Sequence, residues 1–355
     1  MTHYEERLQE DLNRLQSHVK TLGNTVEAAV RNALRALLEF NQKLATDIVI
    51  GDLEVNRDSR ELDRLCHGFV ARHLPTAGHL RYVSSTMRVN VVLERIGDYA
   101  ETISRTVLQL SGGPSENLIR SIELMGDQSL RLFQRSLKAY IARDAEGART
   151  ALEMSSNSVK IFDRVLKDLV TMGDQHSQPT YELFALLACF NRLERIIHQS
   201  KNICEETIFA ATGKVKSRKK FNFLIVDKTN TRASLLVEAI LKRTYPDSGN
   251  HLSCGWEPGV KVDPAYSAFA EERGLDLSDL TPCGFSELDL EFTDIDVVLA
   301  LEDDAPRHFP RPGFHTIVVD CPIPGGTGPT EAFETIAAFL EDLMQKLRGE
   351  EWDEL

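Results

Sequence analysis

Two stretches of the chain, 100 residues apart, share one pattern. Residues 93–104 read LERIGDYAETIS and residues 193–204 read LERIIHQSKNIC. A second pair, DLEVN at residues 52–56 and EMSSN at residues 153–157, matches at an offset of 101. Because apolar residues recur at helical spacing around both pairs, this repeat indicates a duplicated helical unit.

The stretches between these motifs also have a helical pattern. VEAAVRNALRALLEF (residues 26–40) and LATDIVIGDLEV (residues 44–55) place apolar residues at i, i+3, i+4 and i+7. Glycine and proline at positions 23, 75, 112–114, 173 and 179 mark helix ends. We predict about six long helices, arranged as an all-α double three-helix bundle with a shared core. The first repeat would span residues 1–112 and the second, more divergent one residues 113–212.

The bulk composition is that of a soluble globular protein. The 355 residues are 42% hydrophobic and 27% charged, which suits two or three domains. The N-terminal stretch MTHYEERLQEDLNRL has no apolar signal core, and no apolar run reaches the length of a membrane span. We therefore expect a cytoplasmic protein without an integral membrane segment. The six cysteines include no CxxC motif, which favours buried thiols.

The negative charge is concentrated in the last third of the chain. From Lys219 onward there are 12 basic and 26 acidic residues, a balance of −14, whereas the remainder carries +1. Binding to nucleic acid depends on a basic surface that neutralises phosphates. This distribution predicts no nucleic-acid partner.

Acidic residues recur at i, i+4 in both repeats. One set of positions comprises Asp52, Asn56, Glu94 and Asp98, and its counterpart comprises Glu153, Asn157, Glu194 and His198. Each pair lies on one helix face, and two pairs that converge from neighbouring helices supply oxygen ligands for a cation. The alternative is a solvated acidic face. Since amide and imidazole groups carry no negative charge at three of the positions, we expect weak or partial metal sites.

The first 212 residues resemble PhoU, the bacterial phosphate-uptake regulator. The resemblance rests on LGNTVEAAVRNALRALLEFNQKLATDIVIGDLEVN (residues 22–56), HLPTAGHLRYVSSTMRVNVVLERIGDYAETI (residues 73–103) and the duplication. It implies a six-helix fold, E(D)xxxD motifs that hold iron, zinc, manganese or magnesium ions, and repression of the phosphate-starvation response. The implied partners are a phosphate transporter ATPase or a sensor histidine kinase at the membrane, and a second copy in a homodimer. Asn56, Asn157 and His198 stand where the family usually has an acid.

The last third alternates between strands and helices. Short apolar runs occur at residues 221–226 (FNFLIV), 296–301 (DVVLAL) and 315–319 (HTIVV), and helical patterns occur at residues 233–243, 264–274 and 330–351. This alternation predicts an α/β domain with a parallel sheet over residues 221–350. A basic linker, residues 213–220, would precede it.

The α/β domain resembles the low-molecular-weight phosphatases and arsenate reductases over most of residues 222–347. In that family an anion-binding loop between a strand and a helix carries a nucleophilic cysteine and an arginine. The corresponding stretch here is FLIVDKTNTRASLLVEAIL (residues 223–241). Aligned on Asn230 and Ser234, the resemblance places Asp227 at the nucleophile position and Ala233 at the arginine position, with Arg232 one residue away. Residues 318–326 (VVDCPIPGG) place Ile323 at the general acid, with Asp320 nearby. We therefore predict a degenerate, catalytically inactive oxyanion loop formed by Asp227, Asn230, Arg232 and Ser234. A receiver domain fits less well, because the strand DIDVVLAL ends in Leu301, where a receiver needs an aspartate.

These observations favour a non-enzymatic, metal-binding adaptor that restrains phosphate transport or starvation signalling. Two alternatives remain open at this stage. The C-terminal domain could retain phosphatase or arsenate reductase activity, including an aspartyl-phosphate at Asp227. The helical part could instead be an adaptor without metal.

Overall fold

A computed structural model describes residues 3–154, 158–175, 179–215, 219–288, 294–308, 312–324 and 326–348. The chain divides into two compact units, Met1–Lys216 and Ser217–Leu355. The predicted fold classes, a helical bundle followed by an α/β domain, are both confirmed. The boundaries predicted for the two repeats and for the linker stay predictions.

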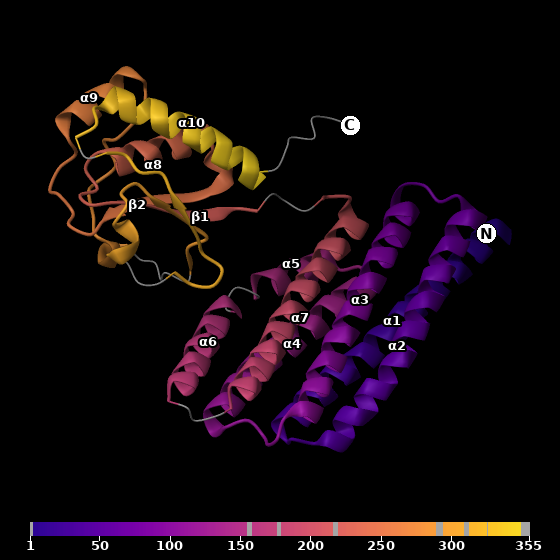
Figure 1. Ribbon diagram of the computed structural model, residues 1–355. Helices are drawn as coiled ribbons and strands as arrows, with labels where there is room; N and C mark the ends of the chain where they lie inside the picture. The colour runs from indigo at the N-terminus through magenta and orange to yellow at the C-terminus, as the bar shows by residue number, and fades with distance from the viewer. Residues whose placement is uncertain are drawn as a thin grey trace. The chain divides into compact units, whose positions relative to one another are not determined.

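The helical unit contains two sets of long helices (Figure 1). The first set is α1 (His3–Leu38), α2 (Gln42–His73) and α3 (Ala77–Gln109). The second set is α4 (Glu116–Ala142), α5 (Ala145–Glu153), α6 (Ser158–Asp174) and α7 (Thr180–Thr212). The prediction of six helices therefore differs from the structure at one place, because the middle helix of the second set is described as two segments. Asp144 caps the first of these by accepting hydrogen bonds from the backbone N–H groups of Glu146 and Gly147.

The helices that carry the LERI motifs, α3 and α7, pack against each other and join the two repeats. Leu93, Ile96, Leu193 and Ile196 are all fully buried in one continuous core. The same apolar spacing on both helices therefore builds the shared core that the duplication predicts. In the described residues, no helix is long and apolar enough to span a membrane.

The C-terminal unit has a four-stranded parallel sheet in the order β2-β1-β3-β4. Its strands are β1 (Phe221–Asp227), β2 (Gly249–Gly255), β3 (Val297–Ala300) and β4 (Ile317–Asp320). The chain leaves β1 for β2 on one side and later returns for β3 on the other, so the order of the strands reverses at β1. In open α/β sheets, ligands bind at such a reversal, beyond the carboxyl ends of the strands.

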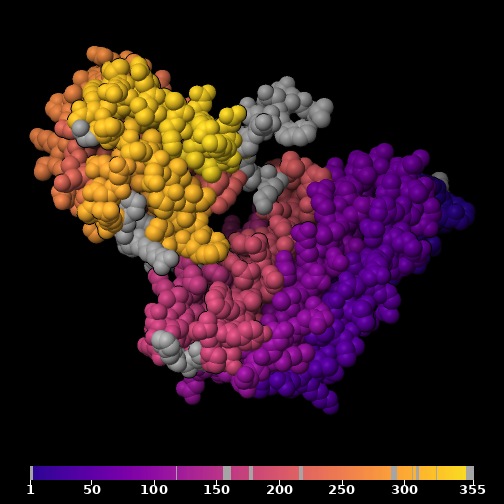
Figure 2. Space-filling model, viewed as in Figure 1, coloured from indigo at the N-terminus to yellow at the C-terminus, as the bar shows by residue number. Residues whose placement is uncertain are grey.

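Helices α8 (Ala233–Thr244), α9 (Pro264–Glu272) and α10 (Pro329–Arg348) bury the larger apolar face of the sheet region. Helix α10, yellow in Figure 2, lies at the surface of this unit. A smaller apolar cluster with Leu224, Val226 and Val298 at its centre forms separately. The continuous apolar sequence of β1 follows from this burial, since five of its seven residues are buried.

Candidate functional site

The acidic positions of the first repeat meet where α2 crosses α3. Gly97 allows the close approach, because a Cβ atom at that position would lie 2.9 Å from Val55 Cγ1 and 3.8 Å from Asp52 Oδ1. The Asp52 carboxylate therefore lies against α3 beside Asp98. Asn56 turns toward the same place and donates a hydrogen bond from Nδ2 to Asp52 Oδ2 at 2.6 Å.

Four carboxylates (Asp52, Glu94, Asp98 and Glu101) form this acidic cluster, and two of them, Asp52 and Asp98, have a raised pKa. Partial burial, followed by the charges of Glu94, Asp52 and Glu101, raises the pKa of Asp98 to about 6. Burial and the charges of Glu101 and Glu94 also raise the pKa of Asp52, whereas the hydrogen bond from Asn56 lowers it. Glu101 was absent from the sequence prediction. The sequence feature that could have identified Glu101 is its position three residues after Asp98, which places both residues on the same side of α3.

This donor set suits a divalent cation in kind. Carboxylate and amide oxygens are ligands for hard cations, and a cation would relieve the repulsion that, after burial, raises the pKa of Asp98. Within the described residues, however, no group of three or more His, Cys, Asp or Glu side chains is close enough to hold a metal ion. The side chains of the cluster would have to draw together around an ion, so the metal site stays a prediction.

The second repeat arranges its counterparts differently. Glu153 is exposed at the end of α5, whereas Glu194 is buried in α7 and His198 is half-buried one turn later. Asn157 lies outside the described residues. A metal ion bound by Glu194 would lie inside the bundle, whereas Glu153 faces solvent. Because these two acids lie in different environments, we expect a weaker site in the second repeat.

The degenerate oxyanion loop connects β1 to α8 and contains its own anion. Asp227 is only 5% exposed at the carboxyl end of β1. Its Oδ1 accepts a hydrogen bond from Asn230 N at 2.5 Å, and its Oδ2 accepts one from Ser234 N at 3.1 Å. Burial raises the pKa of Asp227, while hydrogen bonds from Ser234, Asn230 and Thr229 act in the opposite direction. The donors that would surround a bound oxyanion at this helix N-terminus therefore surround a side chain of the chain itself.

A buried polar network holds the loop in this conformation. Asn230 is fully buried with φ of 52°, in the left-handed region that asparagine tolerates. Its Nδ2 donates to Ser234 Oγ at 3.0 Å and to Ser253 Oγ at 2.8 Å, and its Oδ1 accepts from Cys283 N at 2.9 Å. Ser253 in turn donates to the buried Glu238. The network fixes the loop from β2 and from the strand-like segment at Cys283.

The remaining parts of a phosphate-binding site are displaced or replaced. Arg232 is half exposed and donates from Nε to Asp263 Oδ2 at 2.9 Å, so its guanidinium group is engaged outside the loop. Ala233, the first residue of α8, has no group that could hold an oxyanion. Ile323 lines the same cavity of about 590 Å³ as Asp227, whereas Asp320 is exposed at the end of β4.

The loop carries Asp227 where a thiol phosphatase has its cysteine. The nucleophile position carries a carboxylate that already accepts two backbone hydrogen bonds, and Arg232 pairs with Asp263. An incoming phosphate would also meet a buried carboxyl group. Asp227, Asn230 and Ser234 are joined by hydrogen bonds, and Arg232 lines the same cavity as Asp227 while pairing with Asp263.

Comparison with known proteins identifies the helical unit. The PhoU domain model matches twice, at residues 19–107 and 122–207. The phosphate-specific transport system accessory protein PhoU homolog of Zymomonas mobilis is 30% identical over 205 residues, which cover 58% of this chain and 86% of that relative. The chain belongs to the PhoU family.

Other members of the PhoU family agree with this result. The accessory protein PhoU of Escherichia coli is 27% identical over 203 residues, which cover 57% of this chain and 84% of that protein. The crystal structure of PhoU from Pseudomonas aeruginosa is 28% identical, with a TM-score of 0.56, and covers 58% of this chain and 99% of that one. The two PhoU matches account for the duplicated pattern of the sequence.

The C-terminal unit lies beyond the matched PhoU segments. The tyrosine phosphatase Wzb from Escherichia coli K30 is 20% identical, with a TM-score of 0.31, over 36% of this chain. The α/β class of the unit follows from its own parallel sheet.

Proposed function

We propose that this chain is a non-enzymatic accessory protein that restrains phosphate transport or phosphate-starvation signalling. The observation that carries the proposal is the double PhoU match, because relatives that share it are named accessory proteins of the phosphate-specific transport system. The chain would act in the cytoplasm, beside the membrane complex that it regulates. Its partner would be the transporter ATPase or a sensor histidine kinase, and a second copy could complete the assembly.

The acidic cluster would serve as the metal-dependent part of this regulator. Asp52, Asn56, Glu94 and Asp98 would supply the ligands, with Glu101 next to them. Iron, zinc, manganese and magnesium ions are the candidates, and a bound ion would tie α2 to α3. The raised pKa of Asp98 supports the proposal, because a cation would relieve the repulsion from Glu94, Asp52 and Glu101 that adds to the effect of burial.

The C-terminal unit would be a binding module without catalysis. Support comes from the Asp227 carboxylate, which takes up the backbone donors of the loop, and from Arg232, which pairs with Asp263. A module of this kind contributes affinity for a partner rather than turnover. The proposal rests on the chemical groups at the loop and not on a shared fold.

A complementation experiment in the organism that encodes the chain tests the regulatory role. The gene is deleted, and alkaline phosphatase activity and phosphate uptake are measured in phosphate-rich medium. We expect deletion to derepress both, and wild type to restore repression. Unchanged activity and uptake after deletion would contradict the proposal.

The metal role is tested in the same strain with matched variants. Glu94→Ala combined with Asp98→Ala removes two acids of the cluster. Glu54→Ala combined with Asp63→Ala removes two exposed acids of α2 and is the control. Repression restored by the control but not by the cluster variant would support the metal site, together with metal bound to purified wild type and lost from the cluster variant. Repression restored by both, with no metal on the wild type, would favour the metal-free adaptor.

Enzymatic activity is tested separately on purified protein. We expect no turnover of an aryl phosphate and no reduction of arsenate at any pH. Turnover that disappears in Asp227→Ala would overturn the non-enzymatic assignment.

A further inference from the structure

The last strand of the parallel sheet, β4, is open on one side. It pairs with β3 on its inner side and ends the strand order β2-β1-β3-β4. None of its four residues is buried, and Ile317 and Val318 are 51% and 36% exposed. Phe314, three residues before the strand, is 64% exposed. Three large apolar side chains within five residues therefore face solvent at this edge of the C-terminal unit.

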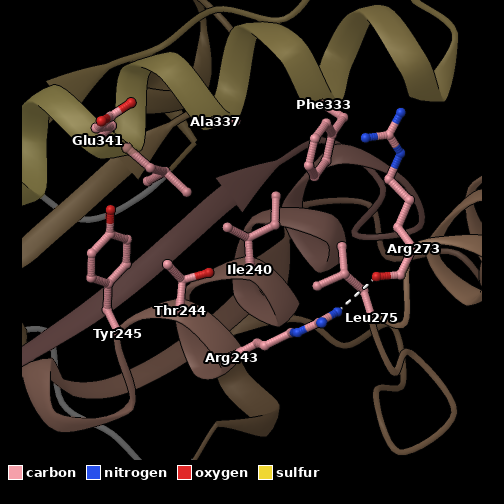
Figure 3. Close-up of a pocket in the computed structure, with 10 residues that line it drawn as sticks. Ile240, Arg243, Thr244, Tyr245, Arg273, Leu275, Phe333, Ala337 and Glu341 are labelled. Carbon is pink, nitrogen blue, oxygen red and sulfur yellow. Dashed lines mark hydrogen bonds between the residues drawn. The ribbon is translucent and has the colours of Figure 1, made fainter.

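The other boundaries of the sheet are better covered. Helices α8 and α10 lie over one face, and in the groove between them Ile240 and Leu275 form a floor that is already buried (Figure 3). At the opposite edge, four of the seven residues of β2 are buried, and Gly255 bridges to Gly284. Of the two edges, the one at β4 is thus more open to a further strand.

The sequence of this edge lacks the features that keep sheet edges apart. Residues 314–321, the β4 edge, read FHTIVVDC and include no lysine, proline or glycine. Proteins that avoid pairing between sheet edges place a charge, a proline or a bulge on such a strand. The one acid of the β4 edge, Asp320, lies at the end of the strand. The composition therefore favours pairing with another strand.

The hydrogen bonds to β3 show which backbone groups of β4 are open. Ile317 N and Cys321 N each donate to a backbone oxygen on the side of β3, both at 2.8 Å. Successive residues of a strand direct their N–H and C=O groups to opposite sides. The groups of Val318 and Asp320 therefore point away from β3, and no strand of the described part of the chain lies there. A strand from outside the chain would find these donors and acceptors open.

We propose that the β4 edge pairs with the β4 edge of a second copy of this chain, antiparallel, about a twofold axis at Val318. In this register the two Val318 residues exchange two N–H···O bonds, and Asp320 N of each copy donates to Thr316 O of the other. On one face of the joined sheet Val318 lies opposite Val318, and on the other face Ile317 lies opposite Val319. The two four-stranded sheets become one continuous sheet.

A second copy is the occupant because this register is self-complementary. The apolar residues meet one another across the axis, whereas each Asp320 lies opposite Thr316 and away from the Asp320 of the other copy. An axis at Asp320 would place two carboxylates opposite each other. The contact is limited to one short strand and its surroundings, so we expect a reversible dimer rather than a permanent one.

This inference rests on the proposed function in one respect, since it gives the second copy of that assembly a surface. Its test measures association alone. A failure here would leave the result of the complementation experiment unaffected.

Sedimentation of the full chain tests the surface. Wild type is measured from about 1 to 100 µM, which brackets dissociation constants in the micromolar range. At high concentration its largest species should have twice the mass of the largest species of Val318→Lys, because two lysines would face each other across the axis. Val260→Lys adds the same charge at an exposed valine of the same unit and should behave as wild type. A wild type that stays monomeric, or equal behaviour of the two variants, would overturn the proposal.

Hydrogen exchange in the wild type gives a second readout, which does not depend on how Val318→Lys folds. The amides of residues 314–321 should exchange several-fold more slowly at high protein concentration than after dilution, whereas those of residues 249–255 in β2 should not change. Exchange in the β4 edge that is independent of concentration would contradict the pairing.

Salt separates pairing of the two edges from attraction between charges. The chain from Lys219 onward has 12 basic and 26 acidic residues, so two C-terminal units repel each other at low ionic strength. Association through the β4 edge should therefore strengthen several-fold between about 20 and 300 mM salt. Association that weakens over this range would indicate ion pairs at another surface and would overturn the proposal.

Discussion

Removing the internal anion of the oxyanion loop should destabilise the C-terminal unit. In Asp227→Ala, the backbone N–H groups of Asn230 and Ser234 lose their acceptor. Each buried donor left unsatisfied costs about 1–3 kcal/mol, and relief from burying a carboxylate, whose pKa is raised, offsets part of the sum. We expect a net loss of about 2–4 kcal/mol.

The emptied loop should then bind an anion from solution. Phosphate or sulfate could accept the same hydrogen bonds in Asp227→Ala, although the arginine of the loop, Arg232, is paired with Asp263. At a phosphate concentration ten times the Kd, the linkage relation gives about 1.4 kcal/mol of stabilisation. The wild type should gain nothing, because its own carboxylate occupies the donors.

Intrinsic tryptophan fluorescence is the appropriate assay, since both tryptophans belong to the C-terminal unit. Thermal unfolding of wild type and Asp227→Ala is followed in chloride and in phosphate at equal ionic strength. Asp320→Ala, which removes an exposed carboxylate from the same unit, is the control. If Asp227→Ala were as stable as wild type, or if phosphate stabilised all three proteins equally, the internal-anion interpretation would be refuted.

Three further predictions concern other parts of the molecule. Asp98→Asn should make the stability of the metal-free helical unit less sensitive to pH. Because the pKa of Asp98 is raised to about 6, its stabilising contribution is full below the pKa of the unfolded chain and is lost as pH rises through 6. The melting temperature of wild type, followed by helical circular dichroism, should therefore fall more steeply between acid and neutral pH than that of the variant. Since Asp98 is exposed, we expect the difference to stay below about 1 kcal/mol, and parallel profiles would contradict it. Asn230→Ala breaks three hydrogen bonds of a fully buried side chain and should cost about 3 kcal/mol in tryptophan-detected unfolding, whereas the exposed Asn250→Ala should cost much less. Leu193→Ala, at the α3–α7 contact, should lower the stability of the helical unit by about 2–5 kcal/mol in denaturant unfolding, and a loss below 1 kcal/mol would show that this contact is not part of a close-packed core.

The sequence predicted the elements whose pattern is local. The helical spacing around Leu93 and Leu193 and the continuous apolar run of β1 each depend on one segment, so periodicity alone identified them. The split of the middle helix of the second repeat into α5 and α6 was not predicted, because no proline or glycine marks it. Glu101 was missed because its role depends on where Asp52 of another helix lies.

The oxyanion loop shows the same limit more clearly. Alignment could place Asp227 at the nucleophile position, and it predicted a degenerate, inactive loop. That the carboxylate turns back onto Asn230 N and Ser234 N depends on the conformation of the loop, which a buried network from β2 fixes. A sequence indicates which groups are present, but the pairing of donors with acceptors appears only in three dimensions.

The carboxylate in the loop has a consequence for any sensor of phosphate. A pocket that fills and empties reports a concentration, because its occupancy changes with supply. A pocket occupied by a side chain of the protein itself has the same occupancy at low and at high phosphate concentration. In a protein that responds to phosphate supply, the state of this loop would not change with phosphate concentration. The change that reports phosphate supply would have to occur at another site of the molecule.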